Sequence, residues 1–476
     1  MARELLAGWG GTAPTSAEVS RPTRPEEVTA GLVHAPRRGV VARGLGRGYG
    51  DAAQNAGGAV ISTTRLDGVA WADEGAGLVR AAGGASLDQL QRFLLPQGWA
   101  LAVLPGTRHV TVGGAVAADV HGKNHGRDGS FARHVVELRL ATPGGVVRVT
   151  PVGDPDLFWA TFGGMGLTGV VVEATVRAVR AETAWVRVVG RRAADLDAVM
   201  AAMAAKDGRH RYAVAWLDGR AGGRAAGRGV VSWGDDAAVA DLAPERRATP
   251  LALGPVKGRS LAVPAWAGAA ALPGVGAAVG NRLRYRRAPA TCAVSVEPLD
   301  RFLFPLDAVD GWNRLYGPAG FVQYQFVVPF SSADVVRVAL GRLRDAGCPP
   351  VLAVLKRLGA SDPGPLSFPM PGWTLAVDFP AARPGLAQVL DGLDELVAGA
   401  GGRIYLAKDA RMRPELLAAM YPDLDRWRAV RRRVDPDGVL ASDLGRRLGL
   451  VGPPVGGGSP PSRAGKSALA SVAGAG

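Results

Sequence analysis

The sequence predicts an α+β fold in two large parts, and three observations favour it. The chain has 476 residues, more than one hydrophobic core usually supports. The first 180 residues hold short apolar runs separated by glycine-rich turns, a pattern typical of short strands joined by loops. Residues 181–400 instead alternate longer strands with amphipathic helices, which predicts a sheet with helices on one face, and we expect this sheet to be mainly antiparallel.

The first part consists mainly of strand patterns, with one specific helix signal among them. Ser86 precedes apolar residues at helical spacing, and Pro96 and Gly98 follow them, so this stretch predicts a helix with a serine N-cap. Pro143 and the two glycines after it mark the turn of a hairpin. The other predicted elements are strands at 39–44, 59–63, 78–82, 135–142, 145–149 and 169–179, and a short helix at 154–162.

The second part follows the same logic up to the C-terminal end. Alternating apolar residues predict strands at 212–219, 321–330, 350–359 and 372–380. Helical spacing predicts helices at 195–206, 332–347 and 385–401. Residues 401–450 are expected to be the last ordered segment. Residues 451–476, rich in Pro, Gly, Ser and Ala, predict a disordered tail.

The composition limits the classes of function. The formal net charge is +14, which either reflects the residue usage of a GC-rich genome or provides a basic surface for phosphorylated or membrane-bound partners. No basic run is interleaved with aromatic residues, so we expect no nucleic acid partner. Cys292 and Cys348 fit no disulfide or metal pattern. Without a leader pattern or an apolar stretch of about 18 residues, we expect a cytoplasmic chain with no signal peptide.

One segment of the second part is unusual because residues 260–281 carry no charge. Four arginines follow it at once: Arg282, Arg284, Arg286 and Arg287. One interpretation is a loop followed by a loose core helix. The other is a flap that contacts a lipid at the inner membrane face through residues 260–287, with the arginines facing headgroups or a phosphate.

Three glycine-rich loops predict a long ligand bound along the backbone. Residues 44–51 follow a strand, but a polar loop and another strand come next, so the helix that a Rossmann motif requires is missing. Residues 105–122 and 162–169 are the other two loops, and each lies beside a strand. Their backbone N–H groups can hold phosphates, and FAD or a similar dinucleotide fits the three together.

The stretch HGKNH, residues 121–125, concentrates polar side chains beside the second loop. His121 and His125 would share one face of a helix, but Gly122 disfavours a helix and no carboxylate ligand accompanies them, so we expect no metal site. A structural turn is the second interpretation. We favour a third, in which a polar loop beside the cofactor carries His121 and Lys123.

These motifs carry a family resemblance that extends from about residue 8 to 450. The motifs are ARGLGRGYGDAAQN at 42–55, PGTRHVTVGGAVAADVHGKNHGRDGSF at 105–131, LSFPMPGWTLAVDFP at 366–380, IYLAKDAR at 404–411 and RRRVDPDGVLASDLGRRLGL at 431–450. They resemble the decaprenylphosphoryl-β-D-ribose 2-oxidases of the vanillyl-alcohol-oxidase superfamily. The resemblance implies a PCMH-type FAD-binding domain of two α+β subdomains at 8–180, a substrate domain at 181–400 and a segment returning to the flavin at 401–450.

The resemblance also implies an activity. It is the FAD-dependent oxidation of the 2-hydroxyl of a polyprenylphosphoryl-β-D-ribose to the 2-keto sugar. That step is the first half of an epimerisation to the arabinose form, used for the cell-wall arabinan of actinobacteria. An NAD(P)H-dependent keto-reductase would act on the product, and a quinone could accept the electrons. The alternatives are an FAD-dependent oxidase or dehydrogenase of another sugar, polyol or aldonolactone, and a flavoprotein without catalytic activity.

The resemblance assigns roles to individual residues. Lys408 and His121 would be catalytic, one taking the hydroxyl proton and the other stabilising the alkoxide. The cofactor would be bound by Ala42, Arg43, Gly44, Leu45, Gly46, Arg47, Gly48, Tyr49, Gly50, Asp51, Gly106, Thr107, Thr111, Val112, Gly113, Gly114, Ala118, Asp119, His121, Gly169 and Tyr405. The substrate would be bound by Tyr49, Lys123, Tyr316, Gln323, Gln325, Lys356, Trp373, Thr374 and Ala376.

Two departures from the family pattern lead to further expectations. Many relatives attach FAD through a histidine of the first glycine loop, whereas residues 42–52 contain none, so we expect non-covalent FAD. Thr374 and Ala376 stand where mycobacterial members carry asparagine and cysteine. A covalent inhibitor that requires a thiol at position 376 would find none.

Overall fold

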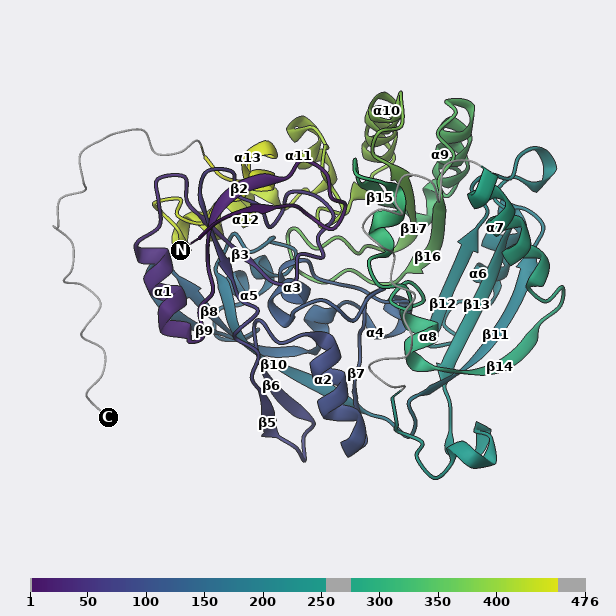
Figure 1. Ribbon diagram of the computed structural model, residues 1–476, viewed down its shortest axis with the longest axis horizontal. Helices are drawn as coiled ribbons and strands as arrows, with labels where there is room; N and C mark the ends of the chain where they lie inside the picture. Colours follow the sequence, from purple (N-terminus) through teal and green to yellow (C-terminus); the bar gives the residue numbers. More distant parts are fainter. Residues whose placement is uncertain (1, 254–274, 453–476) are drawn as a thin grey trace.

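The computed structural model describes residues 2–253 and 275–452, which form three sheets (Figure 1). The first sheet has four strands in the order β1-β2-β4-β3. Its pairs β2–β4 and β3–β4 are parallel, and the edge strand β1 is antiparallel. The bounds are β1 Ala2–Leu6, β2 Thr15–Ser20, α1 Pro25–Val33, β3 Val40–Arg43 and β4 Ala59–Ser62.

The second sheet is antiparallel and is centred on the long strand β10. Ser86 caps α2 with a full capping box, as its position in the sequence predicts. The hairpin β8–β9 turns at residues 142–145. The bounds are β5 Val69–Asp73, β6 Leu78–Ala82, α2 Leu87–Leu94, β7 Trp99–Leu101, α3 Val112–Ala117, α4 His125–Asp128, β8 Val135–Thr142, β9 Gly145–Val149, α5 Pro155–Thr161 and β10 Val170–Arg180.

The third sheet has eight strands, all paired antiparallel, in the order β14-β11-β13-β12-β16-β17-β15-β18. Helices α6, α9 and α10 pack on it, as the alternation of strands and helices predicts. The strands are β11 Trp185–Ala193, β12 Tyr212–Leu217, β13 Gly229–Asp236, β14 Ala293–Pro298, β15 Phe321–Val328, β16 Leu352–Leu358, β17 Gly372–Pro380 and β18 Arg403–Ile404. The helices are α6 Leu196–Ala205, α7 Val275–Arg287, α8 Leu299–Leu303, α9 Asp334–Asp345 and α10 Leu386–Gly399.

The pleat of the third sheet separates two kinds of side chain. Tyr324 and Phe326 of β15 and Leu375 of β17 are buried with α10 in the main core. Neighbouring positions point to the opposite face because side chains alternate along a strand. The register pairs Gln323 with Asp378, so these two polar residues share that opposite face. The apolar residues of β15 thus lie on the face that packs against α10, and its polar residues lie on the opposite face.

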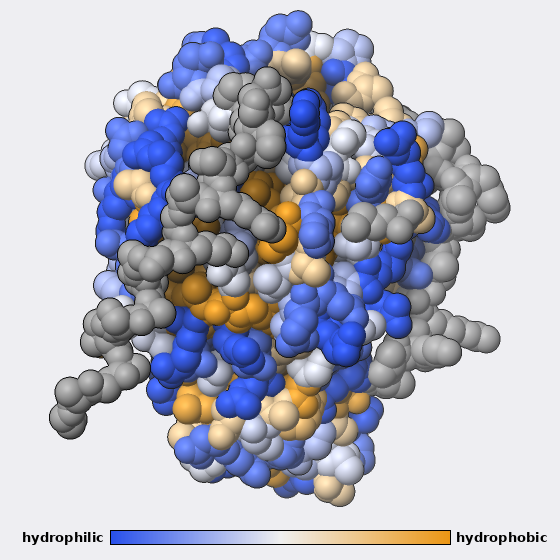
Figure 2. Space-filling model, turned by 90° about the vertical axis from the view of Figure 1, so that its left-hand side faces the viewer, coloured by the Kyte–Doolittle hydropathy of each residue, from blue (hydrophilic) through white to orange (hydrophobic). Residues whose placement is uncertain are grey.

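The C-terminal segment returns from the third sheet to the first (Figure 1). After β18 the chain runs past the first glycine loop, and Val40 of β3 forms a bridge with Leu440. The carboxylate of Asp443 accepts hydrogen bonds from the Ala56 N–H. The helices are α11 Leu417–Met420, α12 Leu424–Val434 and α13 Asp443–Arg447. Figure 2 shows this end of the molecule, where hydrophobic residues lie among hydrophilic ones.

Most elements expected from the sequence are present, with differences at the ends. β1 begins at Ala2, before the expected domain start at residue 8. The first glycine loop leads into a strand and not a helix, as predicted. Of the expected disordered tail, residues 453–476 lie outside the described residues. Residues 254–274, which include most of the uncharged segment, also lie outside them. No helix within 2–253 or 275–452 is long and apolar enough to cross a membrane.

Replacing Trp427 by leucine tests how the C-terminal segment is attached. The Trp427 ring is fully buried between α12 and α5, and its indole N–H donates to the Ala160 carbonyl over 3.0 Å. We expect Trp427→Leu to lower the free energy of unfolding by about 3 kcal/mol in urea titration, because packing and a buried hydrogen bond are both lost. Trp71→Leu is the control. Trp71 is partly exposed, and its replacement should cost less than about 1.5 kcal/mol. Equal losses would contradict this account.

Candidate active site

The first two glycine-rich loops meet at close range. A Cβ atom on Gly44 would overlap the side chain of Thr111, and one on Gly113 would lie 3.0 Å from the Gly83 carbonyl oxygen. Thr111 also caps α3, because its hydroxyl accepts a hydrogen bond from Gly114 N–H over 3.1 Å. Only glycine allows the backbones to approach this closely. The first loop therefore lies against the second at Gly44 and Thr111.

The first glycine loop also docks onto the C-terminal segment. The Tyr49 N–H donates to the Ala407 carbonyl over 3.0 Å, and a Cβ on Gly50 would overlap the Asp409 carbonyl oxygen. Arg447 binds the Asp51 carboxylate at 2.8 and 3.0 Å and the Asp409 carboxylate at 2.8 Å. Both carboxylates are thus bound from one guanidinium. These ion pairs fix the position of the turn at residues 407–409, which carries Lys408.

Lys408 lies at the centre of the polar face of the third sheet. Its ammonium nitrogen is 3.6 Å from the centroid of the Tyr49 ring, close enough for a cation–π contact. Burial lowers the pKa of Lys408 to about 7, the nearby Asp378 opposes this shift, and Lys356 adds to it. A lysine with this pKa is in part unprotonated at neutral pH and can accept a proton.

Asp378 is a site residue that the sequence reasoning missed. It is fully buried on β17, where Gln323 donates to it over 2.6 Å and the Tyr316 hydroxyl donates over 3.4 Å. Burial raises the pKa of Asp378 to about 6, while these hydrogen bonds and Lys408 oppose the rise. The signal in the sequence was one carboxylate inside the apolar strand LAVDF. An unpaired buried charge is costly, so such a residue predicts nearby partners.

His121 lies beside two aromatic residues, Tyr405 of the C-terminal segment and Phe368 of the loop before β17. Its ring centroid is 5.3 Å from that of Tyr405 and 5.4 Å from that of Phe368. The Gln325 amide donates to His121 Nε2 over 3.2 Å, so the proton of the neutral ring lies on Nδ1, which is buried without a partner. Burial and Lys356 hold the pKa of His121 well below its usual value. His121 is therefore a neutral donor.

Two further lysines form a cationic end of the same face. Burial lowers the pKa of Lys356 to about 8 and that of Lys123 to about 7, and Lys356 contributes to the shift of Lys123. Lys123 donates to the Phe302 carbonyl and lies 4.5 Å from the Phe302 ring centroid. Mutual repulsion and desolvation both favour binding of an anion here, because an anion offsets both costs.

The loop that carries Lys123 forms a bridge between the parts of the chain. The Lys123 carbonyl accepts from Ala213 N–H over 2.9 Å, and His125 Nδ1 accepts from Gly359 N–H over 3.0 Å. His125 is thus used structurally. Within the described residues no group of three or more His, Cys, Asp or Glu residues could hold a metal ion.

The other expected substrate residues divide between the two faces. Thr374 accepts from the Gln325 amide over 3.2 Å, and Ala376 pairs with Gln325 in the register, so both lie on the polar face. Trp373 points to the opposite face, where Arg357 lies 4.8 Å from its ring centroid. Naming Trp373 as a substrate residue was therefore wrong, because neighbouring strand positions alternate between faces.

Several expected cofactor residues use their side chains inside the protein. The Thr107 hydroxyl donates to Asp307 over 3.1 Å, and the Asp119 carboxylate accepts from Ser367. Arg43 donates to the carbonyls of Ala7 and Ala53. Tyr405 donates to the Ala118 carbonyl over 2.8 Å. These residues shape the site, and only their backbone or ring faces are left for a ligand.

Comparison with known proteins decides the family. The chain is 42% identical over 453 residues to a decaprenylphosphoryl-β-D-ribose oxidase of Mycolicibacterium smegmatis, a match covering 94% of this chain and 97% of that protein. The chain belongs to the decaprenylphosphoryl-β-D-ribose oxidase family. A model of the FAD binding domain matches residues 16–150, and a model of D-arabinono-1,4-lactone oxidase matches residues 381–448. The chain is therefore an FAD-dependent oxidoreductase with the α+β fold that its sequence predicts.

Two other relatives of this chain differ in how much of the chain they match. An uncharacterised protein of Streptomyces coelicolor is 44% identical over 374 residues, which cover 77% of this chain and all of that protein. An L-gulono-1,4-lactone dehydrogenase of Mycobacterium tuberculosis is 31% identical over 180 residues, only 37% of this chain and 41% of that protein. The matches to the Mycolicibacterium and Streptomyces coelicolor proteins are thus much longer than the match to the dehydrogenase.

The residues present fit FAD. Gly44, Gly46 and Gly48 of the first loop, and Gly113 and Gly114 of the second, are partly exposed and carry no side chain, which suits the close approach of a pyrophosphate. The unpartnered Nδ1 of His121 is a buried donor close to Tyr405 and suits a polar ring. We infer that these segments hold the phosphates and the isoalloxazine, respectively.

Replacing Gly44 by alanine tests the role of the glycine backbone. The added Cβ would overlap Thr111, so we expect Gly44→Ala to lose at least about tenfold in FAD affinity, which corresponds to 1.4 kcal/mol. The flavin content of the purified protein, read from its absorbance, measures the effect. Gly68→Ala is the matched control because no atom lies within 4 Å of its added Cβ. Full flavin content in Gly44→Ala would contradict this role.

Proposed function

We propose that this chain oxidises the 2-hydroxyl of a polyprenylphosphoryl-β-D-ribose to the 2-keto sugar, with FAD bound non-covalently. The observation that carries the proposal is the cationic pair Lys123 and Lys356 on the same face as Lys408 and His121. A neutral sugar requires no such pair. A sugar with a phosphate at one end and a reacting hydroxyl further along matches both groups of residues.

The arrangement assigns a task to each residue. Lys408 accepts the proton of the reacting hydroxyl, and Asp378 and Tyr49 hold the lysine in place. Gln323 and Gln325, two apart on β15, are positioned to bind sugar hydroxyls from one side. His121 donates from Nδ1 toward the cofactor. Bound FAD supplies the hydride acceptor for the carbon.

Several finer features belong to the same proposal. The first glycine loop contains no histidine, which supports non-covalent FAD. The product would pass to an NAD(P)H-dependent keto-reductase, which completes an epimerisation for cell-wall arabinan, and a quinone would take the electrons. Peripheral contact with the inner membrane face through residues 260–287 suits a lipid-linked substrate, although residues 260–274 lie outside the described residues. We propose a cytoplasmic location as part of the same hypothesis.

A second candidate is oxidation of another sugar, polyol or aldonolactone. The match of residues 381–448 to the D-arabinono-1,4-lactone oxidase model favours it, and so does a match of 29% identity over 174 residues to an alditol oxidase of a Streptomyces species. The first match covers the segment with Lys408 but not Lys356. Chemistry at the reacting hydroxyl is therefore common to both candidates, and the cationic pair discriminates between them.

Reduction of the bound flavin tests the proposal directly. Farnesylphosphoryl-β-D-ribose is added without oxygen, and the flavin absorbance near 450 nm is followed. We expect bleaching because the substrate delivers a hydride to the flavin. Ribose without phosphate should bleach it at least about 100-fold more slowly at equal concentration, because about 3 kcal/mol of phosphate binding is lost. Equal bleaching by both sugars would favour the second candidate.

Lys408 can be tested separately from cofactor binding. We expect Lys408→Ala to lower the rate of flavin reduction by about 10²–10⁴-fold, because the base is lost, while the flavin content stays unchanged. Lys206→Ala is the control. This lysine lies 4.4 Å from the Trp233 ring centroid on the helix-covered side of the sheet, and its replacement should leave the rate unchanged. A normal rate in Lys408→Ala would exclude a catalytic role.

The pH dependence of kcat/KM reports the same lysines. The base must be unprotonated, so we expect kcat/KM to rise with pH up to about 7, the pKa of Lys408. Above about pH 7 to 8 it should fall, because Lys123 and Lys356, with pKa values of about 7 and about 8, lose the charge that binds the phosphate. Asp378→Asn should move the acid limb to lower pH, since Asp378 raises the pKa of Lys408. An unchanged acid limb in this variant would contradict the assignment.

A further inference from the structure

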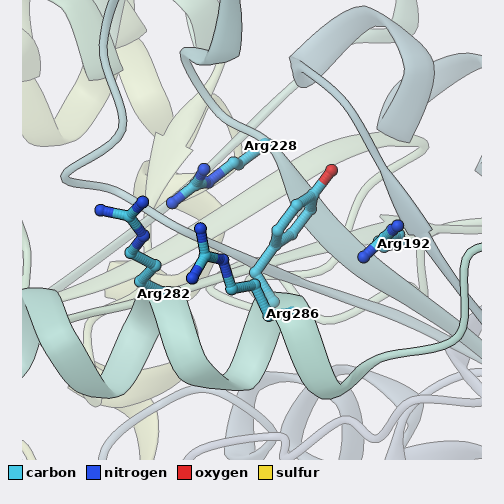
Figure 3. A pocket seen from close by; sticks show the side chains of 5 residues that line it. Arg192, Arg228, Arg282 and Arg286 are labelled. Atoms are coloured by element: carbon cyan, nitrogen blue, oxygen red, sulfur yellow. The ribbon is translucent and has the colours of Figure 1, made fainter.

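A second cluster of cations lies away from the sugar site, at the far end of the large sheet. Its cavity of about 500 Å³ is lined by Arg192, Arg228, Arg282, Tyr285 and Arg286 (Figure 3). Arg282 and Arg286 project from α7, and Arg228 and Arg192 approach from the sheet side. We call these residues the arginine pocket.

The arginine pocket has an excess of positive charge. Asp218 is the carboxylate at its edge, where it binds Arg228 over 2.7 Å and accepts from Asn281 of α7 over 3.3 Å. Four arginines and one aspartate leave a net charge of 4 − 1 = +3. Within the described part of the chain, no ion pair is recorded for Arg192, Arg282 or Arg286. Arginine forks of this kind suit phosphate oxygens.

The arginine pocket is too far from Lys356 to share one phosphate with it. The register runs from Val354 through Trp216 and Val230 to Arg192, three strand steps across the sheet. At about 4.8 Å per step, the backbone of Arg192 is on the order of 15 Å from that of Lys356, and neither Lys356 nor Lys123 lines the cavity. An anion in the arginine pocket is therefore additional to the phosphate of the substrate.

Apolar side chains are exposed next to the pocket. Val279 and Leu283, four residues apart on α7, are 60% and 44% exposed, and Val294 of the edge strand β14 is 56% exposed. Residues four apart lie on the same face of a helix. Arg282 and Arg286 are also four residues apart, so these two arginines of the pocket lie next to the apolar stripe. A helix with apolar residues outward and arginines on its flank matches the boundary between headgroups and acyl chains.

We propose that the arginine pocket binds the phosphate of an anionic phospholipid headgroup, and that Val279, Leu283 and Val294 contact the adjacent acyl region. This inference makes specific the membrane contact suggested above, and it does not depend on which sugar is oxidised.

Co-sedimentation of the full chain with vesicles at low ionic strength tests the inference. The vesicles contain phosphatidylcholine alone or with an equal part of phosphatidylglycerol. We expect binding only to the anionic vesicles, and about 30-fold weaker binding by Arg282→Gln/Arg286→Gln, because each arginine near an anionic surface contributes about 1 kcal/mol. Arg37→Gln/Arg177→Gln is the matched control, since it removes the same charge from exposed positions in the FAD-binding half. It should bind within about twofold of the wild type.

Two further measurements are needed. One distinguishes a lipid headgroup from a free phosphate, and the other distinguishes this inference from the proposed sugar oxidation. Leu283→Gln should weaken vesicle binding about threefold or more if the anion belongs to a lipid surface, while binding of free glycerol phosphate stays unchanged. Flavin reduction by the soluble farnesyl substrate should be normal in Arg282→Gln/Arg286→Gln, so failure there would implicate the sugar site instead. The inference is wrong if the wild type does not bind anionic vesicles, if both double variants lose binding equally, or if Leu283→Gln has no effect.

Discussion

The ion pairs of Arg447 are the constraint on which the site depends. One guanidinium binds the carboxylates of Asp51 and Asp409, which come from opposite ends of the chain. Asp51 closes the first glycine loop, and Asp409 follows Lys408 directly. Because partly buried carboxylates are costly without a partner, this three-residue cluster favours one position of both segments. Lys408 is thereby fixed beside the backbone that is inferred to hold the cofactor.

The large sheet supplies the second half of the site through its pleat. Alternate residues of β15 and β17 either pack against α10 or project to the polar face, so hydrophobic burial fixes where Gln323, Gln325 and Asp378 point. A one-residue shift of register would turn all three into the core. The stability of the fold and the geometry of the site therefore rest on the same packing, and the site needs no separate scaffold.

The sequence predicted what local patterns encode. Ser86 signalled a helix start, and the loop after β3 predicted correctly that no Rossmann helix follows. It did not reveal Asp378, because the partners of that residue are 55 and 62 residues away in the chain. It also misplaced Trp373, since the motif names a stretch of strand but not the face on which each residue lies. Asp51 was expected at the cofactor because it belongs to the first glycine motif, but the motif does not show that its carboxylate binds Arg447.

The most direct test of this account is native-state hydrogen exchange in Arg447→Gln compared with the wild type. The Tyr49 amide, which donates to Ala407, reports the docking of the glycine loop on the segment with Lys408. The account predicts that amides of residues 47–51 and 405–410 lose protection together, by about tenfold or more, while those of β15 and β17 keep theirs. If only residues around Arg447 itself lose protection, the ion pairs do not hold the site together.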